Sequence, residues 1–177
     1  VLNDIKLHYI EYFDNFMNQK NLFGLSSCFV DFDDPIDLFK IWMSEAEKNE
    51  INDPNALSLA TTNKKNEPSV RMVLLKGLSE KGFVFYTNLN SPKSLDLKIN
   101  SSAAMCFHWK SIQRQIRISG NITQVSETEA DNYFNSRPYE SRIGAWASDQ
   151  SKTMKTREEF LKKIEEFKNK NKNEKVL

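Results

Sequence analysis

Arg71-Met72-Val73-Leu74-Leu75-Lys76 opens the stretch that decides the fold, and Gly82-Phe83-Val84-Phe85-Tyr86-Thr87-Asn88 continues it. Two short apolar runs, separated by a turn between Leu78 and Gly82, predict two strands joined as a hairpin. An apolar run that is buried must leave a terminal cation at the edge of the core. We therefore expect Arg71, Lys76 and Lys93 at the ends of these strands.

Cations held on rigid strands are well suited to bind a phosphate. The alternative is that these are ordinary charges at strand ends, and a single strand would favour that interpretation. The same pattern occurs twice here, with Tyr86-Thr87 and the turn Ser91-Pro92-Lys93 beside it. The repetition favours a phosphate site.

Around this stretch the sequence predicts an antiparallel fold. Five strands are expected, with mostly short, turn-like links between them, at 56–62, 69–76, 82–88, 103–109 and 114–125. The longer link 91–102 is expected to hold a helical turn or two around 94–99. Successive strands without long intervening helices indicate a small barrel or curled sheet rather than a doubly wound fold. The predicted class is α+β, mainly antiparallel β.

Helices are expected before and after the strands. Residues 7–17 could form a short amphipathic helix, and 21–33 a connection. Asp34 and Pro35 are suited to start a helix whose apolar stripe is Phe39, Trp42, Met43 and Ala46. Ser126 to Glu129 and Thr156 to Glu159 have the capping-box pattern, and the second opens a helix with an apolar stripe of Phe160, Leu161, Ile164 and Phe167.

Length and composition limit the possible functions. The chain has 177 residues, with 25 basic and 24 acidic side chains and a net charge of +1. This balance gives no broad field for nucleic acid or an anionic membrane. Cys28 and Cys106 are too few for a disulfide framework, which favours a cytoplasmic location. His8 and His108 without clustered ligands predict that there is no metal site.

We expect one domain, because 177 residues suffice for a single core. Its expected parts are an N-terminal arm (1–33), a helix with the barrel strands (34–125), a helical segment (126–170) and a polar tail (171–177). The polar run before Leu177 is typical of a loop rather than of a domain end.

Strand periodicity constrains how the cations are used. Arg71 and Lys76 are five residues apart, so on a regular strand they point to opposite faces. They therefore cannot both bind one phosphate without a bulge or an effect of the strand end. Two neighbouring ligands, such as a cofactor and its substrate, fit this spacing better.

A second group of polar side chains is Tyr133, Arg137 and Ser141, at helical spacing. Pro138 is expected to break the helix into two short ones with a bend. A phenol, a guanidinium and a hydroxyl beside a new helix N-terminus could bind a phosphate. The alternative is a solvated helix end with a surface arginine.

Two further stretches are less specific. Gln115 belongs to an alternating strand, where its amide could contact the edge of a heterocycle or simply face water. Trp146, expected to be buried, precedes a helix end and a loop that contains Gln150 and Ser151. The sequence shows no nucleophile–base pair and no glycine-rich phosphate loop, so an enzyme of this kind would take its reactivity from a cofactor.

Taken together, several stretches between about Asp34 and Phe167 resemble the pyridoxamine 5′-phosphate oxidase family. They are Arg71 to Lys76, Phe85 to Asn88, Arg114-Gln115, Tyr133 to Pro138, Ile143 to Trp146, and Gln150-Ser151. The resemblance implies an FMN-binding split β-barrel that works as a homodimer, with the flavin at the subunit interface.

The resemblance also implies roles for the matching residues. Arg71 and Lys93, helped by Gln150 and Ser151, would bind the FMN phosphate. The rest of the flavin would be surrounded by the backbone of Arg71, Met72, Val73, Leu74, Leu75 and Lys76 and by Tyr86, Thr87 and Gln115. The substrate phosphate would be held by Lys76, Tyr133, Arg137 and Ser141.

The implied reaction oxidises pyridoxamine or pyridoxine 5′-phosphate to pyridoxal 5′-phosphate, with O₂ as acceptor and H₂O₂ as product. The flavin would carry the chemistry, so no catalytic side chain is expected. Alternatives are another FMN-binding split barrel of the flavin reductase type and a non-catalytic flavin or pyridoxal phosphate carrier. Tyr133, Arg137 and Ser141 argue against the flavin reductase alternative, in which a pocket for a substrate phosphate has no purpose.

Three departures from the family pattern affect these expectations. Pro92 stands where the family commonly has a basic residue, and the N-terminal stretch lacks an arginine-rich segment. The family's C-terminal strands, with their Trp, Arg-Leu-His and further Arg, have no counterpart in this sequence. A fragment of a normal oxidase is the favoured explanation, and a natural short form is the alternative. Either way, an incomplete site is expected, with phosphate anchors but without the groups that orient the ring.

Overall fold

The computed structural model describes residues 6–11, 34–79, 81–148, 150–154 and 156–171. Strands and helices alternate along the chain before a helical end. In order they are β1 (Lys6–Glu11), α2 (Pro35–Asn49), β2 (Ala56–Thr62), β3 (Pro68–Leu74), β4 (Gly77–Ser79), β5 (Gly82–Val84), α3 (Pro92–Ile99), β6 (Ser102–Trp109), β7 (Arg114–Asn121), α4 (Glu127–Ser136), α5 (Tyr139–Ala147) and α6 (Arg157–Lys170).

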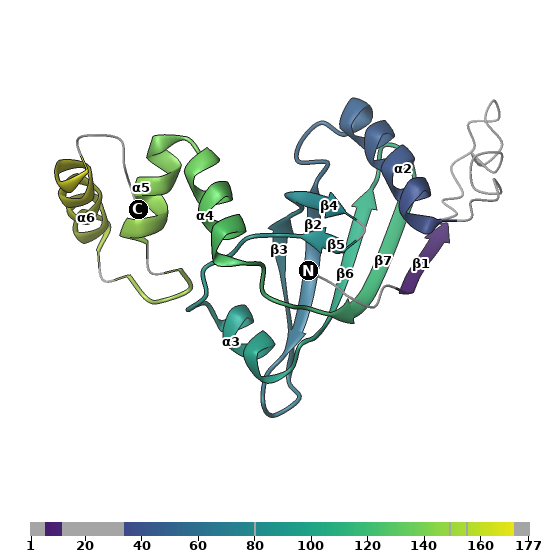
Figure 1. Cartoon of the computed structure of the whole chain (residues 1–177), viewed down its shortest axis with the longest axis horizontal. Helices are drawn as coiled ribbons and strands as arrows, with labels where there is room; N and C mark the ends of the chain where they lie inside the picture. Colours follow the sequence, from purple (N-terminus) through teal and green to yellow (C-terminus); the bar gives the residue numbers. More distant parts are fainter. Residues whose placement is uncertain (1–5, 12–33, 80, 149, 155, 172–177) are drawn as a thin grey trace.

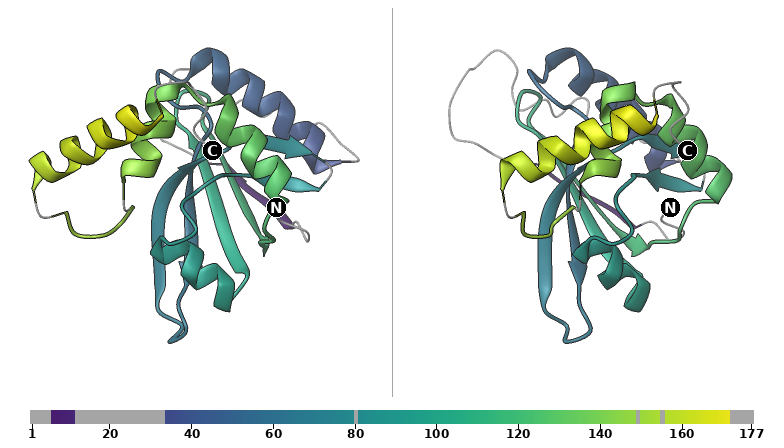
Figure 2. Two further views of the ribbon diagram at one scale, coloured as in Figure 1. Left: turned by 60° about the vertical axis from the view of Figure 1, so that its left-hand side comes forward. Right: turned by 90° about the vertical axis from the view of Figure 1, so that its left-hand side faces the viewer.

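The strands form one antiparallel sheet in the order β1-β7-β6-β2-β3, with β4 and β5 as a separate hairpin (Figure 1). The α+β class expected from the sequence is confirmed. Helices α4 to α6 stand to one side of the sheet in Figures 1 and 2. We call the sheets with α2 and α3 the barrel region, and residues 127–170 the helical arm.

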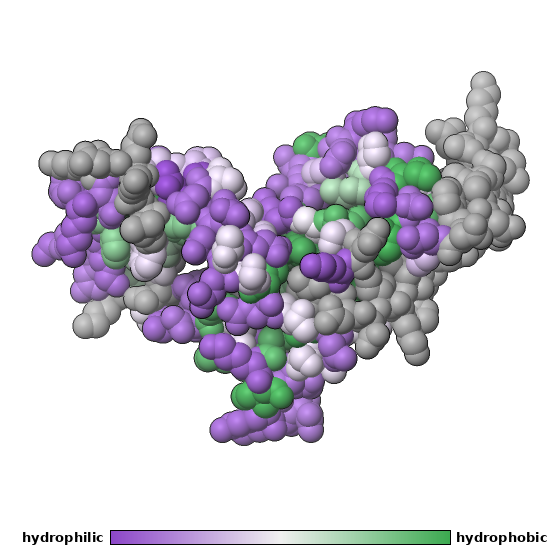
Figure 3. All heavy atoms as spheres, viewed as in Figure 1, coloured by the Kyte–Doolittle hydropathy of each residue, from purple (hydrophilic) through white to green (hydrophobic). Residues whose placement is uncertain are grey.

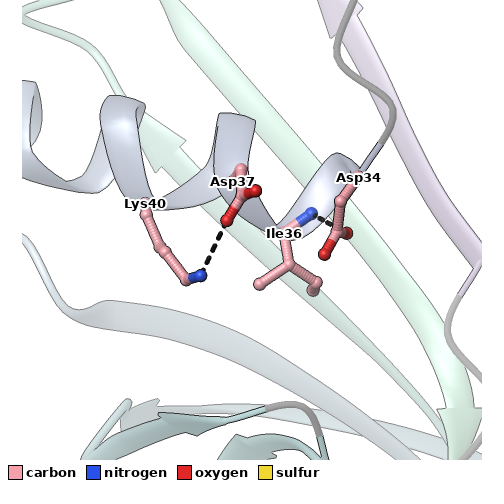
Figure 4. A network of polar contacts seen from close by, with 4 residues as sticks. All are labelled: Asp34, Ile36, Asp37 and Lys40. Atoms are coloured by element: carbon pink, nitrogen blue, oxygen red, sulfur yellow. Dashed lines mark hydrogen bonds and ion pairs between the residues drawn. The ribbon is translucent and has the colours of Figure 1, made fainter.

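Helix α2 begins as its sequence predicts and covers the core. Asp34 caps it by accepting a hydrogen bond of 2.8 Å from the Ile36 backbone N–H, and Lys40 pairs with Asp37 at 2.7 Å (Figure 4). Phe39 lies on the buried face and packs against Phe83 and Phe107, with ring centroids 4.8 and 5.2 Å away. Edge-to-face aromatic packing of this kind stabilises the core beyond the area it buries.

The two faces of the sheet differ. Leu57, Met105, Phe107 and Ile116 lie on the inward face and are almost fully buried. The outward face has large exposed side chains on edge strand β3, namely Val70, Met72 and Leu74, which are 69%, 64% and 37% exposed. Alternation along the strands therefore separates a closed core from an open apolar surface.

Two expectations about secondary structure are wrong. The helix expected at 7–17 is replaced by β1, which pairs with β7 over Lys6–Glu11; residues 12–17 lie outside the described residues. Ladder hydrogen bonds to the edge of β7 favour a strand here, and a local helical pattern contains no information about that edge. The expected strand 82–88 ends at Val84, and it forms its hairpin with β4 rather than with the strand that carries Arg71, which pairs with β2.

The positions of the cations also differ from the expectation. Arg71 lies in the middle of β3, not at its end, and Lys93 lies in the first turn of α3. Arg71 can occupy a mid-strand position because β3 is the edge strand. From there its long side chain carries the guanidinium to polar groups at the end of the inward face.

The helical arm follows the predicted capping pattern. Ser126 and Thr156 accept hydrogen bonds from the backbone N–H of Glu129 and Glu159, and the helix breaks at Pro138 between α4 and α5. Trp146, expected to be buried, is 49% exposed. Among the described residues of the three helices, only Ile143 and Ala147 are buried.

Candidate functional site

Arg71 is held by strand β2 and its own strand. Its Nη1 donates to the Leu59 carbonyl at 3.1 Å and to the Thr61 hydroxyl at 2.8 Å, and its Nη2 donates to the Ser69 hydroxyl. Register explains this arrangement, since Arg71 lies opposite Leu59 on the inward face. A guanidinium has five N–H donors, so these three bonds leave donors for a ligand.

Lys93 approaches from the first turn of α3. Its Nζ donates to the hydroxyls of Thr87 at 3.1 Å and Ser91 at 3.2 Å, and the residue is only 6% exposed. Pro92 starts the helix, as it commonly does, and Ser91 precedes it as the N-cap. The ammonium group therefore lies at a helix N-terminus, where the backbone dipole also favours an anion.

The two cations form an electrostatically unfavourable pair. Burial, and then the positive charge of Arg71, lower the pKa of Lys93. No carboxylate among the described residues forms an ion pair with either side chain. Two neighbouring cations without an acidic partner are stabilised by a bound oxyanion, and a phosphate group fits this requirement.

The loop after α5 completes this cluster. The Oε1 atom of Gln150 accepts from the Thr87 hydroxyl and the Asn88 backbone N–H, both at 3.3 Å. Ser151 follows with φ 64°, in the left-handed region. Hydrogen bonds thus join Thr87 to Lys93 and Gln150, and Arg71 lies close enough to lower the pKa of Lys93. The resemblance implied Arg71, Lys93 and Gln150 for the cofactor phosphate and Thr87 for the rest of the flavin, and these roles stay predictions.

A second group joins the barrel region to the helical arm. The rings of Tyr86 and Tyr133 stack with centroids 3.7 Å apart and planes within 5°. The Tyr86 hydroxyl lies 3.5 Å from Oε1 of Glu129, one helical turn before Tyr133. Burial, and then the Glu129 carboxylate, raise the pKa of Tyr86. Tyr86 therefore stays a neutral phenol that can donate a hydrogen bond.

No hydrogen bond, ion pair or ring contact is seen between the residues predicted to hold the substrate phosphate, all of which lie in the described part of the chain. Tyr133 lies on α4, Arg137 is the C-cap of α4, and Ser141 lies on α5. The Arg137 guanidinium lies over the Phe134 ring at 5.8 Å. Lys76 is exposed between β3 and β4, where it lines a shallow hollow against α2. In this chain the four residues therefore form an open arrangement.

Gln115 lies apart from the cation cluster. It pairs with His108 on the outward face of the sheet, whereas Arg71 faces inward on β3, three strands further along. The intervening residues of the predicted flavin segment alternate in the same way, with Met72 and Leu74 outward and Val73 inward. One copy of the chain therefore does not bring Gln115 to Arg71.

Sequence reasoning missed several supporting residues. Thr61 and Ser69 accept hydrogen bonds from Arg71, Asp96 accepts one from Thr61, and Glu129 faces Tyr86. For Thr61 a signal existed, because Leu57, Leu59 and Thr61 alternate on one strand face and end in a hydroxyl. Asp96 offered no such signal, since its role depends on where α3 packs.

Other kinds of site find no support in the described residues. They contain no group of three or more His, Cys, Asp or Glu residues arranged to hold a metal ion. No helix in the described ranges is both long and apolar enough to cross a membrane.

The fold and the cluster define a small antiparallel-sheet protein with two neighbouring cations, Arg71 on β3 and Lys93 on α3. A sequence profile described as Pyridoxamine 5′-phosphate oxidase matches residues 43–171. The chain is 61% identical over 160 residues to the pyridoxine/pyridoxamine 5′-phosphate oxidase of Pelagibacter ubique, covering 89% of this chain and 77% of the relative. It is 55% identical over 139 residues to that of Sinorhizobium fredii, covering 78% and 68%. The chain belongs to the pyridoxamine 5′-phosphate oxidase family.

Solved structures agree on the fold. PhzG from Burkholderia lata, in complex with tetrahydrophenazine-1-carboxylic acid, aligns with a TM-score of 0.72 at 27% identity, covering 78% of this chain and 72% of that chain. A pyridoxamine 5′-phosphate oxidase-related, FMN-binding protein from Nostoc punctiforme aligns with a TM-score of 0.59 at 17% identity, covering 75% and 73%. The second similarity concerns the fold alone.

Proposed function

We infer that this chain is an FMN-dependent oxidoreductase that oxidises pyridoxamine or pyridoxine 5′-phosphate to pyridoxal 5′-phosphate. Family membership and the identity to curated relatives with this activity support the assignment. When bound, FMN supplies the hydride acceptor of this oxidation and passes the electrons to O₂, giving H₂O₂. The side chains bind and orient the two reactants.

The observation that carries the proposal is the pair formed by the half-buried Arg71 and the buried Lys93, for which no ion pair with a carboxylate is seen among the described residues. In the proposed site both cations bind the FMN phosphate. Thr87 positions Lys93 by accepting its hydrogen bond, and Gln150 in turn accepts from the Thr87 hydroxyl. Ser151 is proposed to add a hydroxyl contact. Because the anchors are already assembled, binding requires little reorganisation.

The substrate phosphate is proposed to bind at the open group of Lys76, Tyr133, Arg137 and Ser141. Arg137 and Ser141 flank the start of α5, where backbone N–H groups add favourable dipoles. Stacking of Tyr133 on Tyr86 places this group beside the cofactor pocket. A phosphate anchored here would orient the remainder of the substrate toward the flavin.

Anaerobic reduction of the flavin tests the activity directly. The protein loaded with FMN is mixed with pyridoxine 5′-phosphate, and the visible absorption of the flavin is followed. We expect bleaching, with pyridoxal 5′-phosphate formed in equal amount. Retained colour with saturating substrate would contradict the oxidase function and would favour a flavin-binding protein without this activity.

We further propose that the protein acts as a homodimer whose outward sheet faces form the interface. Exposed Val70, Met72 and Leu74 give that face an apolar surface typical of an interaction site. Gln115 lies on the same face, so a second copy could bring it to a flavin held by Arg71. The cytoplasmic location expected from the sequence stays a prediction.

Sedimentation tests the dimer. Val70→Lys puts a charge on the apolar surface and is expected to shift the protein from dimer to monomer. Lys98→Glu, at an exposed position on α3, should leave the dimer intact. A wild-type monomer that binds FMN tightly would contradict an interface flavin.

A further inference from the structure

We propose that Asp96 is a positioning residue for the cofactor phosphate and acts through Thr61 on Arg71. The inference rests on the proposed function, because it assumes that Arg71 binds FMN. Neither Asp96 nor Thr61 is among the residues that the family resemblance assigns to the site. Together they extend the phosphate site behind the residues that touch the ligand.

The three side chains form a continuous series of hydrogen bonds across three elements. Thr61 on β2 donates from Oγ1 to Oδ2 of Asp96 on α3 at 2.9 Å. The same Oγ1 accepts from Nη1 of Arg71 on β3 at 2.8 Å. Both distances lie in the range of well-formed hydrogen bonds.

The direction of these bonds is fixed by chemistry. A threonine hydroxyl has one proton and two lone pairs, and the Arg71 guanidinium can only donate. Because an ionised Asp96 can only accept, the hydroxyl proton must point to Asp96 and a lone pair must face Arg71. Without this carboxylate the hydroxyl could rotate and present its proton elsewhere.

Burial makes this orientation consequential. Thr61 is 2% exposed, so water competes little for its hydroxyl. Arg71 carries a positive charge next to that of Lys93, and repulsion between them favours other rotamers of the long arginine side chain. The Thr61 hydroxyl and the Leu59 carbonyl, both accepting from Nη1, oppose this movement.

Helix α3 therefore has two functions at one phosphate. Lys93, in its first turn, would contact the phosphate directly, and Asp96, one turn later, fixes the arginine on the neighbouring strand. Docking of a single helix would assemble both cations in the proposed pocket.

The test is a double-mutant cycle on FMN affinity, measured by quenching of flavin fluorescence in the full chain. Thr61→Val removes the hydroxyl and keeps the branched shape, while Thr61→Ser restores it. Thr62→Val is a matched control, because it deletes a neighbouring hydroxyl that accepts a 2.8 Å bond from Asn100 and has no contact with Arg71. Asp96→Ala removes the carboxylate at the α3 end of this series of hydrogen bonds, at a half-buried position.

We expect Thr61→Val and Asp96→Ala each to weaken FMN binding by roughly three- to tenfold, on the scale of one hydrogen bond. Thr61→Ser and Thr62→Val should bind as wild type does. In an Arg71→Ala background, Thr61→Val should cause no further loss, because the residue it positions is gone.

Two results would overturn the inference in different ways. Equal losses from Thr61→Val in the wild-type and Arg71→Ala backgrounds would mean that Thr61 acts on general stability instead of on Arg71. Wild-type protein that fails to bind FMN would overturn the proposed function itself, and with it the positioning role of Asp96. If the wild type binds FMN and the Thr61→Val and Asp96→Ala variants bind it with the same affinity, only the positioning role of Asp96 and Thr61 would be refuted.

Discussion

The barrel region and the helical arm are built very differently. Phe39, Trp42, Phe107 and Trp109 make one closed aromatic core in the barrel region, all at or below 2% exposure. The arm buries only Ile143 and Ala147 among its described residues, and Trp146 stacks on Phe167 while still half exposed. Figure 3 shows the arm's visible surface as mostly hydrophilic, with apolar side chains gathered over the sheet and α2.

The proposed phosphate anchors follow this division. Arg71 and Lys93 are fixed in the barrel region by bonds to β2, Thr87 and Ser91. Tyr133, Arg137 and Ser141, all described residues, lie on the arm, and no hydrogen bond or ring contact is seen to join them. The comparison indicates that the cofactor site is preorganised, whereas the substrate site depends on how the arm is placed against the barrel region.

The largest predicted effect concerns core packing. Phe107→Ala, at a fully buried position in contact with Phe39 and Trp109, should lower the free energy of unfolding by about 3–5 kcal/mol. Trp146→Ala on the arm should cost far less, because its side chain is half exposed. Chemical denaturation measures both, and equal losses would show that the arm is packed as tightly as the core.

The next effect concerns the cofactor anchor. Arg71→Ala should weaken FMN binding by about 1.5–3 kcal/mol, the scale of a hydrogen bond to a charged group. Isothermal titration with FMN measures this loss. Arg157→Ala, an exposed arginine at the start of α6, is the control. Unchanged affinity in Arg71→Ala would remove Arg71 from the cofactor site.

The dependence of FMN affinity on pH tests Lys93. An ammonium group binds phosphate only when protonated, so affinity is present below the pKa of Lys93 and is lost as pH rises through it. Since burial and Arg71 lower this pKa, the loss should begin at a lower pH than for an ordinary lysine. Titrations with FMN across the alkaline range should show this loss of affinity. In Lys93→Met the affinity should no longer fall as the pH rises through this range. The same alkaline loss in Lys93→Met would assign the titration to another group.

The smallest predicted effect concerns the connection between the two regions. Tyr86→Leu removes the stack on Tyr133 and should cost about 0.5–1.5 kcal/mol of arm docking, while Tyr86→Phe keeps the ring. Limited proteolysis of the arm measures docking. Faster cleavage in both variants would attribute the docking energy to the hydroxyl and Glu129 rather than to ring stacking.

The sequence predicted the parts of this molecule that depend on local chemistry. The Asp34 cap, the capping boxes, strand β2 and the helix break at Pro138 follow from neighbouring residues alone. It did not predict strand β1, whose conformation depends on pairing with distant β7. Trp146 was expected to be buried because tryptophan is apolar, but Phe134 and Phe167 cover only part of it.

The candidate site, like the fold, could be predicted only in part from the sequence. Residue types and the family resemblance identified Arg71, Thr87, Lys93 and Gln150, which the fold brings together. Asp96 and Thr61 could not be recognised from spacing, because their relation to Arg71 arises only when α3 packs against β2. The separation of Gln115 from Arg71 likewise depends on strand order.

The central claim is that two regions hold two different phosphates, and one crossed measurement tests it most directly. Titrations of FMN and of pyridoxal 5′-phosphate, the reaction product, are compared for the wild type, Arg71→Ala and Arg137→Ala. The account predicts that Arg71→Ala loses FMN affinity, whereas Arg137→Ala keeps FMN and loses about tenfold or more in pyridoxal phosphate affinity. Loss of FMN from Arg137→Ala to the same degree as from Arg71→Ala would contradict the division between barrel region and helical arm.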